Sequence, residues 1–355
     1  MATAAASNPW PWSAHASLVA RRLDSPGSYL LTFELLLDGC PSELLLPGQH
    51  LVLAPAAPHE ADGDEATPVG QSRPYTPIEM SGRSLTILVK SYSPPAEHPG
   101  RGAFSRWLTS LRMGGSVQMS GPFGAVALDL QPHCSSLLHL LEHGMVLPLR
   151  RLVLIAGGSG ATPVVQTLHA ACARLGTSSA AVDASRQLPS QHPLEIWVLI
   201  SDRTPHDSVL VSQISALHTA HPELVVSVER TYTALPTGLP PPPDAADTRR
   251  IDAPMVRDLL PPPSADTVAL VSGPPSFEAA VGRSLAEVGH AHVVLLSSGE
   301  ISSPALEVRG PPGADRVPRQ FVAALRCCVQ ASVAPTGKAT RDEAADRTEE
   351  AMLCA

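Results

Sequence analysis

The sequence predicts a β + α/β protein: an N-terminal antiparallel β-barrel followed by a doubly wound parallel sheet. Up to about residue 130, short apolar or alternating runs are broken by Gly, Pro and Asp, which is typical of an antiparallel barrel. From residue 151, apolar strands alternate with amphipathic helices, which indicates a parallel sheet covered on both faces. We therefore place the two domains at residues 14–130 and 151–299, with a linker at 131–150 and a polar, partly disordered tail at 300–355.

The predicted barrel strands are separated by turn residues and interrupted by one helix. The strands cover residues 16–24, 28–37, 48–56, 84–92 and 115–130. Residues 103–115 have helical periodicity and end on two glycines, Gly114 and Gly115. The stretch 55–70 is predicted as a loop insertion.

The second half begins with the apolar run "RRLVLIAGG" and repeats the strand–helix pattern. Its strands are predicted at residues 150–158, 194–202, 224–232, 266–273 and 291–298. Its helices are predicted at residues 162–175, 208–220, 255–261 and 276–289. In such a sheet the carboxyl ends of parallel strands share one edge, where ligands bind.

Composition excludes several classes of function. The net charge of −8 without a dense basic block argues against a nucleic-acid partner. The six cysteines show no spacing typical of zinc sites, so we expect free thiols, no metal and a reducing, cytoplasmic location. No apolar run reaches about 18 residues, so no transmembrane segment is expected. The first 23 residues lack acids and carry Arg21 and Arg22, a weaker indication of a mitochondrial presequence.

Three motifs of the first half combine turn residues with polar side chains. In "RPYTP", residues 73–77, prolines hold an arginine, an aromatic ring and a hydroxyl in extended backbone. Tyr75 can stack on a planar ring, Thr76 can hydrogen-bond its edge, and Arg73 can neutralise a phosphate. "GRGAFSRWL", residues 100–108, places glycines at a helix start, where backbone N–H groups can bind phosphate. "LPGQH", residues 46–50, reads as a turn into a strand.

Two motifs of the second half lie at strand-to-helix turns. In "IAGGSGATPVVQ", residues 155–166, a buried strand runs into three glycines and then a helix, which lets backbone approach a pyrophosphate. "VSGPPSF", residues 271–277, is predicted at the same edge of the sheet. The glycine motif also suggests the nucleophile turn of an α/β-hydrolase, but Ala161 stands where that turn requires glycine.

Lys90 stands out because 23 of the 25 basic residues are arginine. It lies in the apolar run "ILVKSY", and the other lysine, Lys338, lies in the tail. One interpretation is a lysine that protects an edge strand from unwanted pairing. The other is a compact ammonium needed where a guanidinium would not fit.

In their order along the chain, these motifs resemble the NADH–cytochrome b5 reductase family of the ferredoxin–NADP reductase superfamily, over roughly residues 14–297. The resemblance implies FAD in the barrel and a nicotinamide dinucleotide in the second domain. It assigns flavin contacts to the barrel residues Arg73, Pro74, Tyr75, Thr76, Val89, Lys90, Tyr92, Gly102, Phe104 and Ser105. It assigns dinucleotide contacts to Gly157, Gly158, Gly160, Thr162, Pro163, Gly273, Pro274 and Pro275. Thr76, Lys90 and Ser272 are the implied catalytic residues.

The resemblance also predicts the direction of electron flow. Hydride would pass from NADH to FAD, and electrons would leave singly to an acceptor protein such as cytochrome b5. Asp207 matches the family acid associated with NADH, whereas the nearby Arg203 favours NADPH, so NADPH stays an alternative. No feature of the sequence indicates an oligomeric state.

Two departures from the family pattern matter, and the first of them leaves a second class of function open. Ser272 replaces the usual cysteine, and the chain continues for more than fifty residues past its last predicted strand. A flavin-binding protein with weak or no reductase activity is therefore an alternative to the enzyme.

Overall fold

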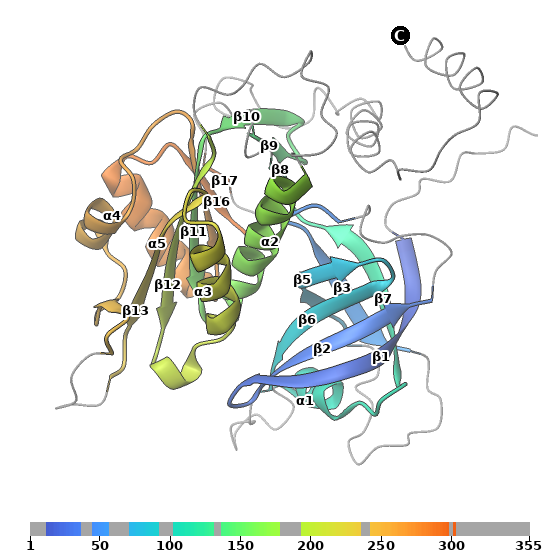
Figure 1. Cartoon of the computed structure of the whole chain (residues 1–355). Coiled ribbons are helices and arrows are strands. Elements are labelled where there is room, and N and C mark those ends of the chain that lie inside the picture. The colour runs from blue at the N-terminus through green and yellow to red at the C-terminus, as the bar shows by residue number, and fades with distance from the viewer. Residues whose placement is uncertain are drawn as a thin grey trace, which may run out of the picture. The chain divides into compact units, whose positions relative to one another are not determined.

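Seven strands of the N-terminal half form one antiparallel sheet, in the order β4-β3-β7-β1-β2-β6-β5 (Figure 1). They are β1 (Trp12–Ser25), β2 (Ser28–Leu35), β3 (His50–Pro55), β4 (Arg73–Tyr75), β5 (Pro77–Ser81), β6 (Ser84–Lys90) and β7 (Ser116–Phe123). The computed structural model describes residues 12–36, 45–56, 71–91, 102–130, 136–177, 193–235, 242–297 and 301–302. All of them belong to one compact unit within Met1–Pro312.

The sheet curls into a barrel because its two edge strands are consecutive in the chain. Only Thr76 separates the end of β4 from the start of β5, so the edges must meet at this residue. Alternating side chains such as Leu31, Phe33 and Ile87 fill the interior and are fully buried. Helix α1 (Ala103–Ser110) adds Trp107 to this core.

Part of the segment predicted as a linker, residues 131–150, is folded. Strands β8 (Val126–Asp129), β9 (Ser136–Leu140) and β10 (Met145–Leu149) form a separate three-stranded antiparallel sheet in the order β10-β9-β8. Buried Leu138 and Leu140 join it to the core of the α/β part. Pro148 fits because β10 is an edge strand, where a missing backbone N–H breaks no ladder.

The C-terminal half is a seven-stranded sheet with the order β14-β13-β12-β11-β15-β16-β17. Its strands are β11 (Arg151–Gly157), β12 (Glu195–Asp202), β13 (Val225–Tyr232), β14 (Ala245–Asp247), β15 (Thr267–Ser272), β16 (His292–Leu295) and β17 (Ile301–Ser302). All pairs are parallel except β16–β17. This sheet and the barrel confirm the predicted fold class.

Helices cover both faces of the parallel sheet. Their bounds are α2 (Ala161–Thr177), α3 (Val211–Ala220), α4 (Ala253–Leu259) and α5 (Pro275–Val288). Residues of α2 and α3 share a buried cluster on one face, and residues of α4 and α5 share another on the opposite face (Figure 1). Among the described residues, no helix has the length and apolar character needed to span a membrane.

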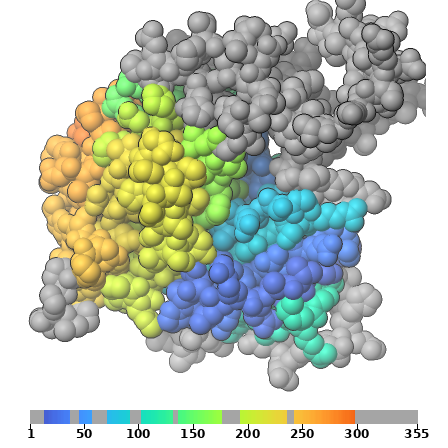
Figure 2. Space-filling model, in the orientation of Figure 1, coloured from blue at the N-terminus to red at the C-terminus, as the bar shows by residue number. Residues whose placement is uncertain are grey.

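The barrel and the α/β part share a continuous apolar core. Leu30, Ile78 and Leu88 of the barrel pack in the same cluster as Val164 and Leu168 of α2. Figure 2 shows the blue and cyan barrel directly against the green and yellow elements of the α/β part. This packing brings the carboxyl edge of the parallel sheet next to the barrel's closure point.

Candidate active site

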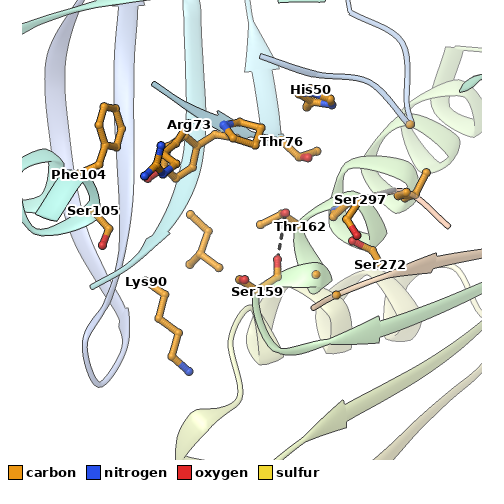
Figure 3. Close-up of a pocket in the computed structure, with 18 of the residues that line it drawn as sticks. His50, Arg73, Thr76, Lys90, Phe104, Ser105, Ser159, Thr162, Ser272 and Ser297 are labelled. Atoms are coloured by element: carbon orange, nitrogen blue, oxygen red, sulfur yellow. Dashed lines mark hydrogen bonds between the residues drawn. The ribbon is translucent and has the colours of Figure 1, made fainter. Parts of the chain in front are cut away.

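A pocket of about 540 Å³ lies where the barrel meets the carboxyl edge of the parallel sheet (Figure 3). It contains most of the predicted site residues: Arg73, Pro74, Tyr75, Thr76, Lys90, Gly102, Phe104, Ser105, Gly160, Thr162, Pro163, Ser272 and Gly273. It also contains residues that were not predicted: Gly48, His50, Leu88, Ser159, Leu296 and Ser297. Segments far apart in sequence thus form one site.

The barrel wall of the pocket is built at the corner between β4 and β5. Thr76 is the single residue between these strands, so Tyr75 and Thr76 stand at the rim of the barrel. The Tyr75 ring stacks on Phe104 at 6.3 Å between centroids, and Phe104 packs on Trp107. An aromatic shelf with an adjacent hydroxyl is suited to bind a flat heterocycle.

The N-terminus of α1 contributes an anion-binding feature to the same wall. Gly102, the N-cap, adopts φ 76° and has no side chain to cap the helix. The Ser105 hydroxyl donates to the Gly102 carbonyl at 2.9 Å. The exposed guanidinium of Arg73 donates to the carbonyl of Ser72 at 2.7 Å. A positive side chain and a helix N-terminus in one pocket can bind a pyrophosphate.

The opposite wall is the glycine loop between β11 and α2. Gly158 adopts φ 57°, and a Cβ on Gly160 would lie 2.2 Å from the carbonyl oxygen of Ser272. The loop therefore packs on the turn after β15 so closely that only glycine fits. Thr162, in the first turn of α2, donates its hydroxyl to the Ser159 carbonyl at 3.2 Å and lines the pocket wall (Figure 3).

Two side chains of α5, Phe277 and Glu278, contact the turn after β15. A Cβ on Gly273 would lie 2.7 Å from the Phe277 ring. The buried Glu278 carboxylate accepts the Gly273 N–H at 3.1 Å and the Ser297 N–H at 3.0 Å. Ser297 also donates its hydroxyl to Glu278 at 2.6 Å. Ser272 is thereby presented to the pocket beside Ser297 (Figure 3).

Lys90 reaches from the barrel toward the α/β part. Its Nζ lies 3.3 Å from the backbone carbonyl oxygen of Asp207 and 3.7 Å from that residue's carboxylate. The lysine is largely buried, with 19% of its side chain exposed, whereas the Asp207 side chain is 39% exposed. Asp207 belongs to the short 3₁₀ turn Pro205–Asp207 after β12 and does not line the pocket itself.

His50 is a pocket residue that the site prediction omitted, although it belongs to the "LPGQH" motif. It starts β3, and its ring packs against Phe123 at 6.1 Å. Burial lowers the pKa of His50. The neutral ring therefore predominates at neutral pH, so His50 offers the pocket one donor and one acceptor.

Some predicted residues lie elsewhere. The Val89 side chain is fully buried in the barrel core, and Leu88 takes its place in the pocket, because successive side chains of a strand point to opposite faces. Gly157 and Gly158 do not line the pocket, and Pro274 and Pro275 are exposed at the start of α5. Tyr92 lies outside the described residues.

The residues fit the two cofactors that the motifs imply. The barrel wall offers an aromatic shelf, a hydroxyl, an arginine and a helix N-terminus, which suit FAD. The opposite wall offers a glycine cradle that a Cβ would fill, which suits a dinucleotide. Within the described part of the chain, no group of three His, Cys, Asp or Glu residues is placed to bind a metal ion.

Comparison with known proteins gives related results for both halves. A family model described as "Oxidoreductase NAD-binding domain" matches residues 154–283. Nitrate reductase [NADPH] of Mycosarcoma maydis is 28% identical over 305 residues, 79% of this chain but 29% of the relative. NADH-cytochrome b5 reductase 3 of Mus musculus is 25% identical over 285 residues, which is 77% of this chain and 82% of the relative.

A solved structure shows the same fold. The cytochrome b5 reductase domain of Ulva prolifera nitrate reductase superposes with a TM-score of 0.61 at 23% identity, covering 78% of this chain and 94% of that domain. The match spans the barrel and the parallel sheet, on which the pocket is built. The chain is therefore similar to NADH-cytochrome b5 reductases and to the reductase domain of a nitrate reductase, and its residues 154–283 match the oxidoreductase NAD-binding domain family.

Proposed function

We propose that this protein is an FAD-dependent oxidoreductase that takes hydride from NADH and passes electrons singly to an acceptor. One observation carries the proposal: the "RPYT" corner of the barrel and the glycine loop of the parallel sheet line the same pocket. A flavin held by the first would face a nicotinamide held by the second. The flavin supplies the conversion from a two-electron donor to a one-electron acceptor, and the protein supplies geometry and electrostatics.

The barrel residues bind and orient the flavin. Tyr75 and its stacked partner Phe104 provide the surface for the ring, and Thr76 offers a hydroxyl at the ring edge. Arg73 and the N-terminus of α1 neutralise the pyrophosphate. His50, held neutral by burial, adds a hydrogen-bonding group without adding charge.

The α/β residues position the dinucleotide. The glycine loop and the start of α2 accept its pyrophosphate, and Ser272 and Gly273 line the place for the nicotinamide. Lys90 and Asp207 lie together at the boundary of the two halves, within reach of a ribose or phosphate. A carboxylate accepts from a 2′-hydroxyl and repels a 2′-phosphate, so Asp207 favours NADH.

The acceptor and the location are proposed on indirect grounds. Relatives include NADH-cytochrome b5 reductases, which suggests cytochrome b5 or a similar protein as acceptor. The nitrate reductase relative carries NADPH in its name, so NADPH is the second candidate donor, supported here by the exposed Arg203 near Asp207. Scattered cysteines suggest the cytoplasm.

A ferricyanide reduction assay with NADH and with NADPH tests the proposal. We expect a yellow, FAD-containing protein whose kcat/KM is higher with NADH. Arg73→Ala should lose FAD, because the exposed guanidinium becomes desolvated when it pairs a bound phosphate, and removing a charge from such a pair costs about 2–5 kcal/mol. Arg83→Ala is the control, since Arg83 is exposed in the β5–β6 turn, away from the pocket. A protein without flavin and without activity would refute the proposal.

A further inference from the structure

Glu278 is buried where α5 otherwise presents apolar residues to the sheet. Only 1% of its surface is exposed, and Val281 and Leu285, three and seven positions on, pack on the same face in the apolar core. A carboxylate in such a place is costly unless hydrogen bonds satisfy it. The position of Glu278 therefore calls for a structural reason.

The hydrogen bonds of Glu278 supply that reason. Oε1 accepts the N–H groups of Gly273 and Ser297, and Oε2 accepts the Ser297 hydroxyl at 2.6 Å. Ionised carboxylates only accept, and all three of these partners donate. One side chain thus joins the turn after β15 to Ser297, which lies two positions past the end of β16.

Both joined segments are walls of the pocket. Gly273 and Ser297 line it together with Ser272, and Figure 3 shows Ser272 and Ser297 side by side on the α/β wall. The turn cannot move toward the glycine loop, because Gly160 already lies against the Ser272 carbonyl. Glu278 holds the turn from the side of α5, because its carboxylate accepts the Gly273 N–H.

We propose that Glu278 is a positioning residue that sets the place of the nicotinamide ring by tying Gly273 to Ser297. The inference rests on the proposed function, because it concerns the same pocket. Hydride transfer requires donor and acceptor atoms about 3–3.5 Å apart, and small misplacements slow it strongly. Glu278 therefore acts on the rate of transfer more than on the binding of the dinucleotide.

Three variants separate the hydrogen bonds from the volume of the side chain. Glu278→Met fills a similar space without an acceptor, so both backbone N–H groups lose their partner. Glu278→Gln keeps an oxygen that can accept both of them and should rescue the position. Glu287→Gln makes the same chemical change near the exposed end of α5, where Glu287 pairs with Arg257 at 3.2 Å, and is the matched control.

Amide hydrogen exchange of the full chain tests the tie without relying on any cofactor. In Glu278→Met, the amides of Gly273 and Ser297 should exchange at least about tenfold faster than in wild type, as expected when local opening becomes easier. Glu278→Gln and Glu287→Gln should exchange like wild type at these two amides. Unchanged exchange in Glu278→Met would overturn the tie.

Anaerobic stopped-flow reduction by NADH tests the consequence. We expect the limiting rate constant of Glu278→Met to fall about tenfold, with the dissociation constant for NADH changed less than about threefold and FAD content unchanged. Glu278→Gln should stay within about threefold of wild type for both values. Equal limiting rates in wild type and Glu278→Met would overturn the positioning role, as would a loss confined to NADH binding. A wild-type protein that NADH does not reduce refutes the proposed function, and the exchange result still decides on the tie.

Discussion

Ser272 is the residue at which this chain departs, at the centre of the site, from the pattern of the cytochrome b5 reductases that it resembles. It lines the pocket at the carboxyl end of β15, and its carbonyl lies against Gly160. The sulfur of the usual cysteine is larger and more polarisable than a hydroxyl. A serine fills less of the space beside the nicotinamide and binds water more strongly.

We therefore expect slow hydride transfer with nearly normal NADH binding. Ser272→Cys should speed flavin reduction about tenfold, which corresponds to roughly 1.4 kcal/mol of the activation barrier for hydride transfer, with KM little changed. Anaerobic stopped-flow measurement of flavin reduction checks this directly. If wild type already reduces at the rate of the cysteine variant, the serine is an accommodated substitution.

Lys90 and Asp207 are paired with each other in this structure, although both are proposed to lie within reach of the dinucleotide. The Nζ lies 3.3 Å from the Asp207 carbonyl and 3.7 Å from its carboxylate. A bound dinucleotide that uses either side chain must compete with or join this pair. The edge-strand interpretation of Lys90 does not account for its position in the pocket.

Lys90→Ala should raise KM for NADH while FAD stays bound, and Lys90→Arg should rescue it only in part, because a guanidinium is wider and planar. Asp207→Asn should lower the ratio of kcat/KM for NADH to kcat/KM for NADPH, because the carboxylate that repels a 2′-phosphate is removed. Steady-state kinetics of the single variants and of the double variant check this. Effects that simply add would indicate that the two side chains act independently.

The alternation of side chains along β6 decides which of its residues can face the pocket. The sequence predicts both Lys90 and Val89 at the flavin site; Lys90 lines the pocket, whereas Val89 is buried in the barrel core. Because adjacent side chains on a strand face opposite ways, Lys90 in the cleft requires Leu88 beside it and Val89 in the barrel. Ser297 gave no such signal, since its role depends on the distant Glu278.

At the scale of elements, long periodic segments could be predicted and short ones could not. The strands around the glycine loop and the helices α2 and α5 follow directly from apolar periodicity. Strands β14 and β17 have three and two residues, too few to show a period. Residues 131–150 are predicted as a linker, but strands β9 and β10 form there with only five residues each, and His139 and Pro148 interrupt their apolar pattern.

One side chain of α2, that of Gln166, clasps the barrel, which here means that it hydrogen-bonds backbone groups of the barrel on both sides of its amide. Gln166 accepts the Gly48 N–H at 3.0 Å and donates to the Gln49 carbonyl at 3.1 Å, in a largely buried setting. Both partners belong to the "LPGQH" turn, which leads into the pocket. The clasp therefore helps to set the distance between the flavin wall and the dinucleotide wall.

Gln166→Ala should lower the free energy of unfolding by about 1–3 kcal/mol, because it leaves a buried backbone donor and acceptor without partners. Gln213→Ala in α3 is the control, since the Gln213 side chain accepts from the hydroxyl of the neighbouring Ser212, a contact within the same helix. Urea denaturation followed by circular dichroism measures both. Equal losses in the two variants would contradict a role for the clasp.

At the scale of the whole molecule, several histidines make stability depend on pH. Burial is the main cause that lowers the pKa of His50, His139, His169, His290 and His292. Both ring nitrogens of His290 are buried without a hydrogen-bond partner. Below the usual histidine pKa of about 6.5, the unfolded chain binds more protons than the folded one. The free energy of unfolding therefore decreases as the pH is lowered.

The free energy of unfolding should therefore decrease as pH is lowered from about 7 to about 5, by up to about 1.4 kcal/mol per pH unit for each such histidine. The buried Asp202 opposes the trend, because burial raises the pKa of its carboxyl. Urea denaturation at several pH values measures the slope, and His290→Leu should reduce it. A free energy that does not change with pH over this range would contradict the burial of these rings.

The central claim is that the pocket holds FAD where NADH can reduce it. Anaerobic titration of the FAD-reconstituted protein with NADH, followed by the absorbance of the oxidised flavin, tests it most directly. We predict that one equivalent of NADH bleaches the flavin, since one hydride carries the two electrons required. A protein that cannot be reconstituted with FAD, or a flavin that keeps its yellow absorbance under excess NADH, would contradict the account.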